Sequence, residues 1–329
     1  LRAAGVSYRP RFDFRGSGLG HTLRLGVWTV LFVIVNQLAY TVVVRLASGG
    51  TASAADGTGI TVYSGAMLVV MVPHSIVTVS LATAILPRLS TSAAHEDMTG
   101  LARTLGSTLR TALVVVAPFA ALLPAIALPL ARVLWGYGAT ADTYQRFEAP
   151  MVVFGFAIVA FTVHYMLLRG FYALERNRLV FFIQCAVSGT NVAAALWFVS
   201  RVDPWDTTAA LALAYGAAYT VGAVVSSLVL VQLLRRGGLT SAGPGPWVGF
   251  TARLLGACLL VLVVSLTTRI VYADTVLELV DDPGLAGAVL EIAVVGLVTL
   301  AVYAASAGVL RLREVTSVLG LVAGRLRRG

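Results

Sequence analysis

Lysine is absent from this sequence of 329 residues, and all 24 basic residues are arginine. Charged residues of either sign make up only 12% of the chain, compared with about a quarter of a typical globular domain. Cysteine occurs twice, at Cys185 and Cys258, without metal-binding spacing, which excludes a disulfide framework and a zinc site. Hydrophobic residues reach 58%, and the mean hydropathy is +0.87. This composition excludes an ordinary soluble domain and is typical of a protein embedded in a bilayer.

Eight apolar runs are long enough to span a membrane, since a spanning helix needs about 20 mostly apolar residues. A shorter apolar piece, Leu128 to Trp135, is expected to be an interfacial half-helix. The sequence therefore predicts an all-α bundle of transmembrane helices in residues 22–310. A cytoplasmic basic segment (1–21) precedes the bundle, and a basic amphipathic tail (311–329) follows it on the anionic inner leaflet. The predicted spans are 22–47, 60–86, 104–127, 149–173, 179–200, 207–234, 248–271 and 285–310.

The arginines indicate how these spans are oriented. If the N-terminus is cytoplasmic, fifteen arginines fall in inner segments and four in outer segments. Because arginine is enriched in cytoplasmic loops, the sequence predicts that both ends of the chain are cytoplasmic. The net charge of +9 does not indicate a nucleic-acid partner, since the arginines flank apolar runs and form no soluble basic face.

A polar stripe in the first span is the strongest candidate binding surface. Gln37, Thr41 and Arg45 are spaced i, i+4, i+8 and share one helical face. A charged side chain at mid-bilayer costs at least about 2.5–3.5 kcal/mol. The stripe is therefore predicted to face a wet cavity; the alternative is that Arg45 reaches the outer headgroups.

Three further polar residues lie inside predicted spans. His74 follows Pro73, with Thr78 one turn on, and it either belongs to a moving gate or bonds a neighbouring span as a packing residue. His164 has no comparable polar neighbour and is expected to pack. Glu291 is expected to pair with an arginine such as Arg269 or to face a groove.

Three local patterns together resemble one family. They are Asn36-Gln37, then Val72-Pro73-His74 followed by residues 79–90, and finally Leu168 to Arg178. In order and spacing they resemble helices seven to fourteen of the fourteen in the MurJ/MviN family, the lipid II flippases of peptidoglycan synthesis. On this resemblance the chain is the C-terminal lobe of a two-lobe flippase in the bacterial inner membrane and has no enzymatic activity.

The resemblance also implies the position of the sites. The first two spans are expected to line a cationic cavity for the lipid II headgroup, and the last two to form a groove for the polyprenyl tail. The implied partners are lipid II, anionic membrane lipids, the missing N-terminal lobe and cytoplasmic regulators of division or wall synthesis. The implied substrate-binding residues are Arg24, Asn36, Gln37, Thr41, Arg45, His74 and Thr78.

The sequence departs from the family at two places. Where many members carry Tyr-Ala-Asp-Arg, this chain has Gly65-Ala66-Met67-Leu68. Where some members bind sodium through an Asn-x-x-x-Asp pair, Asn191 is present but Ala195 replaces the carboxylate. No metal and no cofactor are expected, and coupling to sodium or protons stays open.

Two other functions compete with the flippase. One is export of another lipid-linked glycan or a drug within the same superfamily. The other is a membrane enzyme acting on polyprenyl phosphates. Such an enzyme would need acids or histidines clustered at one membrane face, and the sequence shows no convergent set.

Overall fold

The computed structural model describes residues 19–53, 57–239, 245–277, 284–310, 312, 314 and 315. All the regular secondary structure in these residues is helical. Residues 1–18 of the predicted basic segment and most of the predicted amphipathic tail lie outside the described residues. The α-helices are α1 (Leu19–Ser53), α2 (Ile60–Pro73), α3 (Ser80–Ala94), α4 (Met98–Trp135), α5 (Glu148–Ala173), α6 (Asn177–Val199), α7 (Thr207–Arg236), α8 (Gly245–Tyr272) and α9 (Gly284–Val309).

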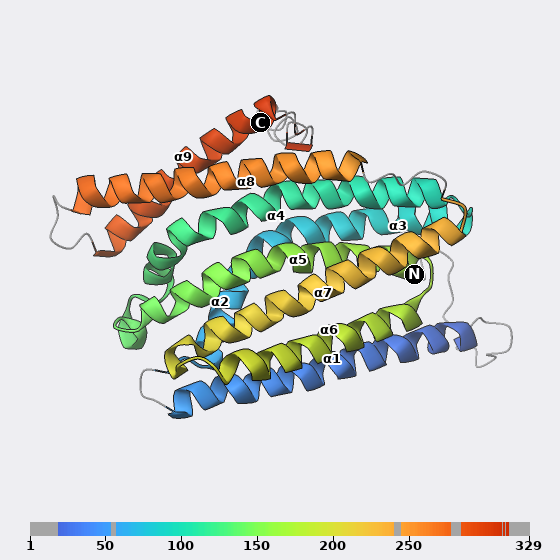
Figure 1. Ribbon diagram of the computed structural model, residues 1–329, viewed down its shortest axis with the longest axis horizontal. Helices are drawn as coiled ribbons and strands as arrows, with labels where there is room; N and C mark the ends of the chain where they lie inside the picture. The colour runs from blue at the N-terminus through green and yellow to red at the C-terminus, as the bar shows by residue number, and fades with distance from the viewer. Residues whose placement is uncertain are drawn as a thin grey trace, which may run out of the picture.

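The described part of the chain contains eight stretches that are long and apolar enough to cross a membrane. Each one overlaps a span predicted from the sequence, so the predicted count is confirmed. The second stretch, residues 60–94, contains two α-helices, α2 and α3, joined by a π-helix, η2 (His74–Val79). Pro73 ends α2 just before η2 and has no N–H to donate, which favours a break in the regular hydrogen-bond ladder. α2 and α3 therefore run in different directions (Figure 1).

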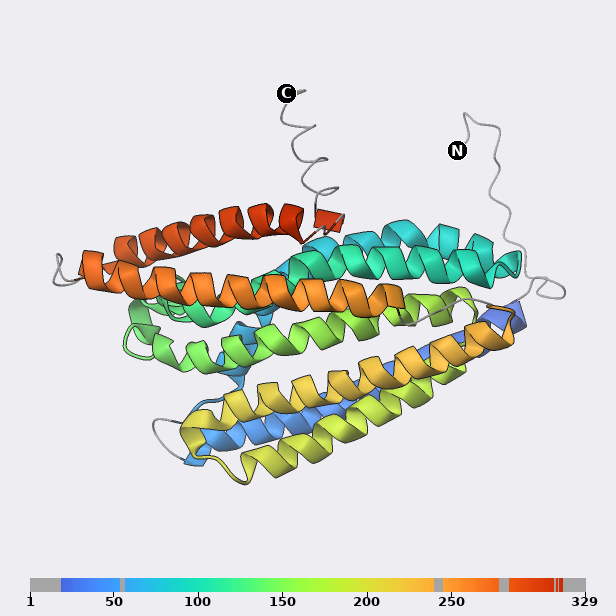
Figure 2. The ribbon, with the colours of Figure 1, turned by 45° about the horizontal axis from the view of Figure 1, so that its top comes forward.

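The helices form two layers with α5 between them (Figure 2). α3, α4, α8 and α9 lie on one side, and α1, α6 and α7 lie on the other. α5 packs against α4 and α7, while α1 packs mainly along α6 and makes few contacts with α2. α4 and α5 are the most buried helices, whereas α1 is mostly exposed. α1 therefore lies at the margin of this bundle.

The prediction of a separate half-helix from Leu128 to Trp135 is wrong, because α4 continues unbroken to Trp135. Three prolines, Pro118, Pro124 and Pro129, lie inside this helix. Each removes one backbone donor, which normally kinks or ends a helix. α4 persists because it is the most buried span, with α3, α5, α8 and α9 packed around it.

For Pro118, a side chain of a neighbouring helix replaces the missing backbone donor. The carbonyl of Val114, four residues before Pro118, loses its usual intrahelical donor. The hydroxyl of Tyr303 on α9 donates a hydrogen bond to this carbonyl at 2.6 Å. A backbone group that cannot reach water in the bilayer is thereby satisfied by a neighbouring helix.

Candidate functional site

A polar pocket of about 360 Å³ lies among α1, α2, α5, α6 and α7. Its walls carry side-chain amides, phenols and one hydroxyl among apolar groups, and none of its lining residues is charged. A pocket of this kind suits a neutral ligand with hydrogen-bonding groups. The lining residues are Asn36, Gln37, Tyr40, Val43, Tyr63, Met67, Met71, Phe161, Gln184, Val187, Ser188, Asn191, Tyr215 and Tyr219.

Gln184 organises the polar wall of this pocket. Its side chain is 2% exposed, and its amide nitrogen donates to Asn36 Oδ1 at 3.3 Å and to Ser188 Oγ at 3.2 Å. Asn191 lies on the same helix, one turn beyond Ser188, and its Oδ1 atom is buried without a hydrogen-bond partner. A buried acceptor without a partner is costly, so the pocket presents an oxygen that is ready to accept a donor from a ligand or water.

Aromatic rings continue the pocket wall on the side of α2, α5 and α7. The ring of Tyr215 lies 4.5 Å from that of Tyr219 and 5.6 Å from that of Phe154. Phe154 in turn packs edge-on against Tyr63 at 5.1 Å. These tilted and edge-on contacts hold the phenols in fixed positions, so the pocket wall is built from groups that have little freedom to move.

The structure divides the polar stripe predicted on the first span. All four residues are exposed on α1, but only Asn36 and Gln37 line the pocket, and Thr41 and Arg45 do not. The Thr41 hydroxyl donates to the backbone oxygen of Gln37 at 2.9 Å and is thus satisfied within its own helix. Arg24, also exposed, lies about three turns before Asn36 and is not among the pocket residues.

His74 and Thr78 lie together against α5, outside the pocket lining. His74 is 3% exposed, and its Nδ1 atom forms a hydrogen bond with Thr162 Oγ1 at 2.9 Å. Its ring packs edge-on against Phe161 at 4.7 Å and Tyr165 at 5.1 Å. These contacts favour the packing alternative for His74.

Two other predictions about residues in spans are confirmed. His164 packs between helices, with its Nδ1 atom 2.9 Å from Ser226 Oγ. Glu291 pairs with Arg269, whose Nε atom lies 3.5 Å from Glu291 Oε1. Arg269 also donates to the backbone oxygen of Pro124 at 3.3 Å. This ion pair thus connects α4, α8 and α9.

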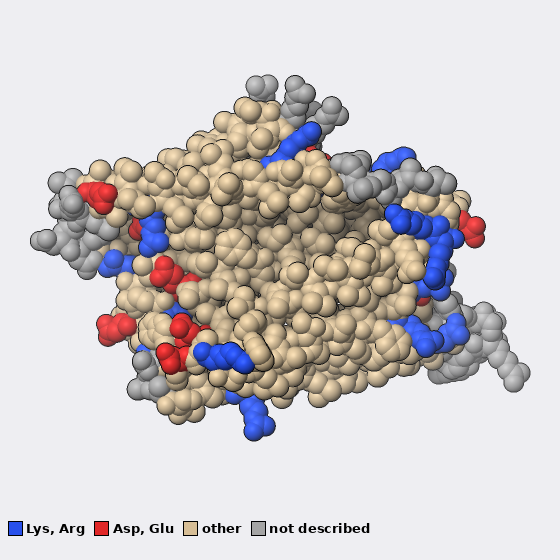
Figure 3. Space-filling view, in the orientation of Figure 1, with Lys and Arg blue, Asp and Glu red and all other residues tan. Residues whose placement is uncertain are grey.

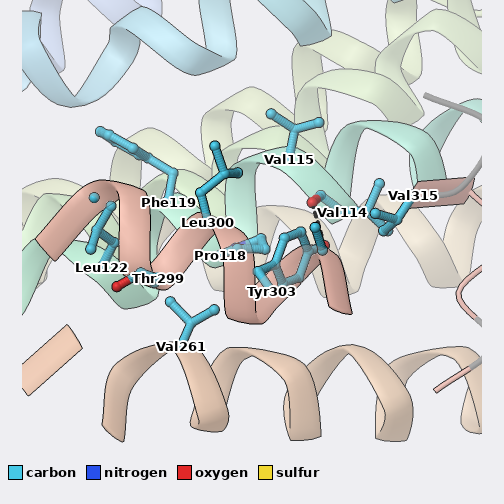
Figure 4. A pocket seen from close by; sticks show the side chains of 12 residues that line it. Val114, Val115, Pro118, Phe119, Leu122, Val261, Thr299, Leu300, Tyr303 and Val315 are labelled. Atoms are coloured by element: carbon cyan, nitrogen blue, oxygen red, sulfur yellow. Dashed lines mark hydrogen bonds between the residues drawn. The ribbon is translucent and has the colours of Figure 1, made fainter. Parts of the chain in front are cut away.

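An apolar groove of about 280 Å³ lies between α4, α8 and α9, and Figure 4 shows its side chains. Val261 closes it on the α8 side, and Leu300 and Tyr303 line it from α9. α4 contributes as much of the lining as α9, through Val114, Val115, Pro118, Phe119 and Leu122. The resemblance assigned this groove to the last two spans alone, so the contribution of α4 was missed.

Sequence reasoning also missed Gln184, Ser188 and the tyrosines of the polar pocket. A signal was present, because Gln184, Ser188 and Asn191 are spaced i, i+4, i+7 along one face of α6. Ala195, one turn beyond Asn191, is fully buried in helix packing. Among the described residues, no group of three or more His, Cys, Asp or Glu side chains could hold a metal ion.

Comparison with known proteins places this arrangement of helices in a family. A family model described as lipid II flippase MurJ matches residues 1–280. The chain belongs to the MurJ family. A curated relative, the lipid II flippase MurJ of Burkholderia cenocepacia, is 30% identical over 188 residues, which cover 57% of this chain and 35% of that protein.

A solved MurJ structure in an inward closed conformation has the same fold. It superposes with a TM-score of 0.61 at 17% sequence identity, over 91% of this chain and 57% of that chain. The chain thus spans well under two thirds of the length of the MurJ proteins that it matches. Membership of this family, together with the apolar helices, identifies a multi-pass protein of the inner membrane.

Proposed function

We propose that this chain is one lobe of a lipid II flippase, which moves the peptidoglycan precursor across the inner membrane by alternating access. The observation that carries this proposal is the uncharged polar pocket inside an otherwise apolar membrane bundle. A polar pocket among membrane helices is expensive to maintain unless it serves a polar ligand. Membership of the MurJ family supports lipid II as that ligand.

Different parts of lipid II fit different surfaces of the lobe. The uncharged sugar and amide groups of the headgroup suit the amides and phenols of the pocket. The pyrophosphate suits Arg45, which is exposed on α1 next to the pocket wall. The polyprenyl tail suits the apolar groove between α4, α8 and α9. The second lobe would close the cavity over the exposed face of α1.

The test uses the complete flippase that contains this lobe. Arg45→Ala should abolish complementation of a flippase-depleted strain at normal membrane levels, because one arginine that faces the pyrophosphate is lost. Arg201→Ala is the matched control, since Arg201 is exposed in the turn after α6 and stacks on Trp197 of that helix, with its guanidinium 3.3 Å from the ring centroid. Arg132, another arginine near this end of the bundle, is unsuitable because it lines the pocket of Arg269 and Glu291. Equal growth of the two variants would contradict the assignment of Arg45.

A further inference from the structure

Another cavity lies at the end of the bundle where α5 meets α6 and α7 terminates. It has a volume of about 800 Å³ and is separate from the pocket and the groove described above. Basic side chains gather at this end of the molecule, whereas most acidic ones lie at the other end (Figure 3). Its lining includes Arg176, Arg178 and Arg236, against one acidic residue, Glu175.

The backbone fixes the positions of these arginines. The turn between α5 and α6 is tight, with Glu175 in the left-handed region at φ 55° and the Arg176 N–H donating to Phe171 O at 2.9 Å. Asn177 attaches the turn to α1, since its amide donates to Leu25 O and to Thr29 Oγ1, both at 3.3 Å. The backbone that carries Arg176 and Arg178 is thus held both by a hydrogen bond to the end of α5 and by the bonds of Asn177 to α1.

The opposite wall is formed by the end of α7. After Arg236 the chain turns through Gly237 and Gly238, and the Leu239 N–H donates to Leu234 O at 3.0 Å. A β-carbon at Gly237 would lie 2.9 Å from the side chain of Met98, so glycine allows α7 to end directly against the start of α4. Arg236 is thereby held across the cavity from the turn.

The three arginines are available to an anion. Arg176, Arg178 and Arg236 are exposed and form no ion pair with any other residue that the structure describes. The guanidinium of Arg178 lies over the rings of Trp28 and Phe182, at 5.6 and 5.7 Å from their centroids. Such stacking orients a guanidinium and leaves its N–H groups free to donate.

The cavity is apolar on the side that leads into the membrane. Leu179 and Leu233 line it below the arginines, and Phe182, one turn beyond Arg178, is 50% exposed. Charge at the membrane surface followed by apolar side chains matches a phosphate group attached to an acyl chain. Basic pockets between transmembrane helices bind the headgroups of anionic lipids in this way.

We propose that this cavity binds the phosphate headgroup of an anionic phospholipid, with an acyl chain lying along Leu179 and Phe182. The guanidinium groups of Arg176, Arg178 and Arg236 donate to the phosphate oxygens from two sides. The bound lipid connects the turn between α5 and α6 to the end of α7. This proposal rests on insertion in the membrane and does not require that the protein transports lipid II.

The experiment measures lipid binding to the purified full-length protein by native mass spectrometry. Phosphatidylglycerol is titrated against the wild type and against a triple variant with Arg176→Gln, Arg178→Gln and Arg236→Gln. Each arginine near an anionic lipid contributes about 1 kcal/mol, so binding should weaken on the order of a hundredfold. The matched control is Arg88→Gln, Arg103→Gln and Arg235→Gln, which removes the same charge from exposed positions outside the cavity lining. It should change binding only a few fold.

Further measurements distinguish binding of a phospholipid from binding of a free phosphate or pyrophosphate ion. Phosphatidylcholine should bind far more weakly, and inorganic phosphate or pyrophosphate at equal concentration should not displace phosphatidylglycerol, because neither carries an acyl chain. Displacement by either ion would overturn the proposal, as would equal losses in the two triple variants. If the glutamine variant is misfolded by circular dichroism, Arg236→Gln is compared with Arg235→Gln. Equal binding by these single variants would also overturn the proposal.

Discussion

Hydrogen bonds between single side chains connect helices whose apolar surfaces would fit many partners. His74 bonds Thr162 between η2 and α5, His164 bonds Ser226 between α5 and α7, and Gln184 bonds Asn36 between α6 and α1. Hydrocarbon offers no competing water, and lipid tails are as apolar as leucine, so such bonds help to select neighbouring helices.

The bond between His74 and Thr162 can be tested by a double-mutant cycle. Thr162→Val should lower the free energy of unfolding by about 1 kcal/mol, because it leaves the His74 ring nitrogen without its partner. In a His74→Leu background the same change should have little further effect. Denaturant unfolding in detergent measures both. Strictly additive losses would show that the two side chains do not interact.

At the level of the helices, prolines have different effects in α4 and in α2. α4 contains Pro118, Pro124 and Pro129 and remains continuous, whereas α2 ends at Pro73 and passes into a π-helix. The difference lies in the surroundings of the two helices. α4 is enclosed by neighbours, and Tyr303 supplies a donor to its Val114 carbonyl, while the stretch that contains α2, η2 and α3 is much less buried than α4.

A second cycle tests this compensation. Tyr303→Phe should destabilise the protein by about 1 kcal/mol, since the Val114 carbonyl then has neither a backbone nor a side-chain donor. Pro118→Ala restores the N–H that normally bonds this carbonyl. In that background Tyr303→Phe should cost much less. Thermal unfolding of the four proteins measures the effect, and an unchanged cost in the Pro118→Ala protein would contradict the role assigned to Tyr303.

Over the whole molecule, the ends of the bundle differ in charge. The turns from α3 to α4 and from α5 to α6 lie at the arginine-rich end, and the turns from α4 to α5 and from α6 to α7 lie at the other end. Since arginine-rich ends are retained in the cytoplasm, we expect the N-terminus of α1 to be cytoplasmic.

Cysteine labelling in intact cells tests this orientation. With Cys185 and Cys258 replaced by alanine, a cysteine at the exposed residue Asp142 or Asp203 should react with an impermeant reagent from outside. A cysteine at His95, which is also exposed but lies at the arginine-rich end, should react only after the membrane is opened. Labelling of the His95→Cys variant in intact cells would reverse the orientation.

The proposal that this chain is one lobe of a flippase leads to a prediction about transport. Residues 1–329 alone should not move lipid II, because the exposed face of α1 with Arg45 needs a second wall. A pyrophosphate in a medium of low dielectric also needs several donors. The measurement compares flipping of labelled lipid II by the isolated chain and by the chain co-expressed with an N-terminal lobe. Equal rates would show that these residues form a complete transporter.

The sequence by itself determined the number of spans and the alternation of charge between their ends. Both are properties of position along the chain, because a span requires only a sufficient apolar length and flanking arginines mark its ends. It also determined the family, through short patterns that are contiguous in the chain. For Glu291 it left two alternatives, and the structure selected the pairing with Arg269.

Only the tertiary structure decided which polar residues share a site. A spacing of four residues exceeds the 3.6 residues of a helical turn, so each step from Gln37 to Thr41 to Arg45 rotates about 40° around α1. The first of these residues therefore lines the pocket, and the other two do not. Likewise, α4 remains continuous because neighbouring helices surround it and one supplies a donor. Which residues line a pocket, and whether a helix with prolines stays continuous, depends on contacts between segments distant in the sequence. The periodicity of one helix gives no information about those contacts.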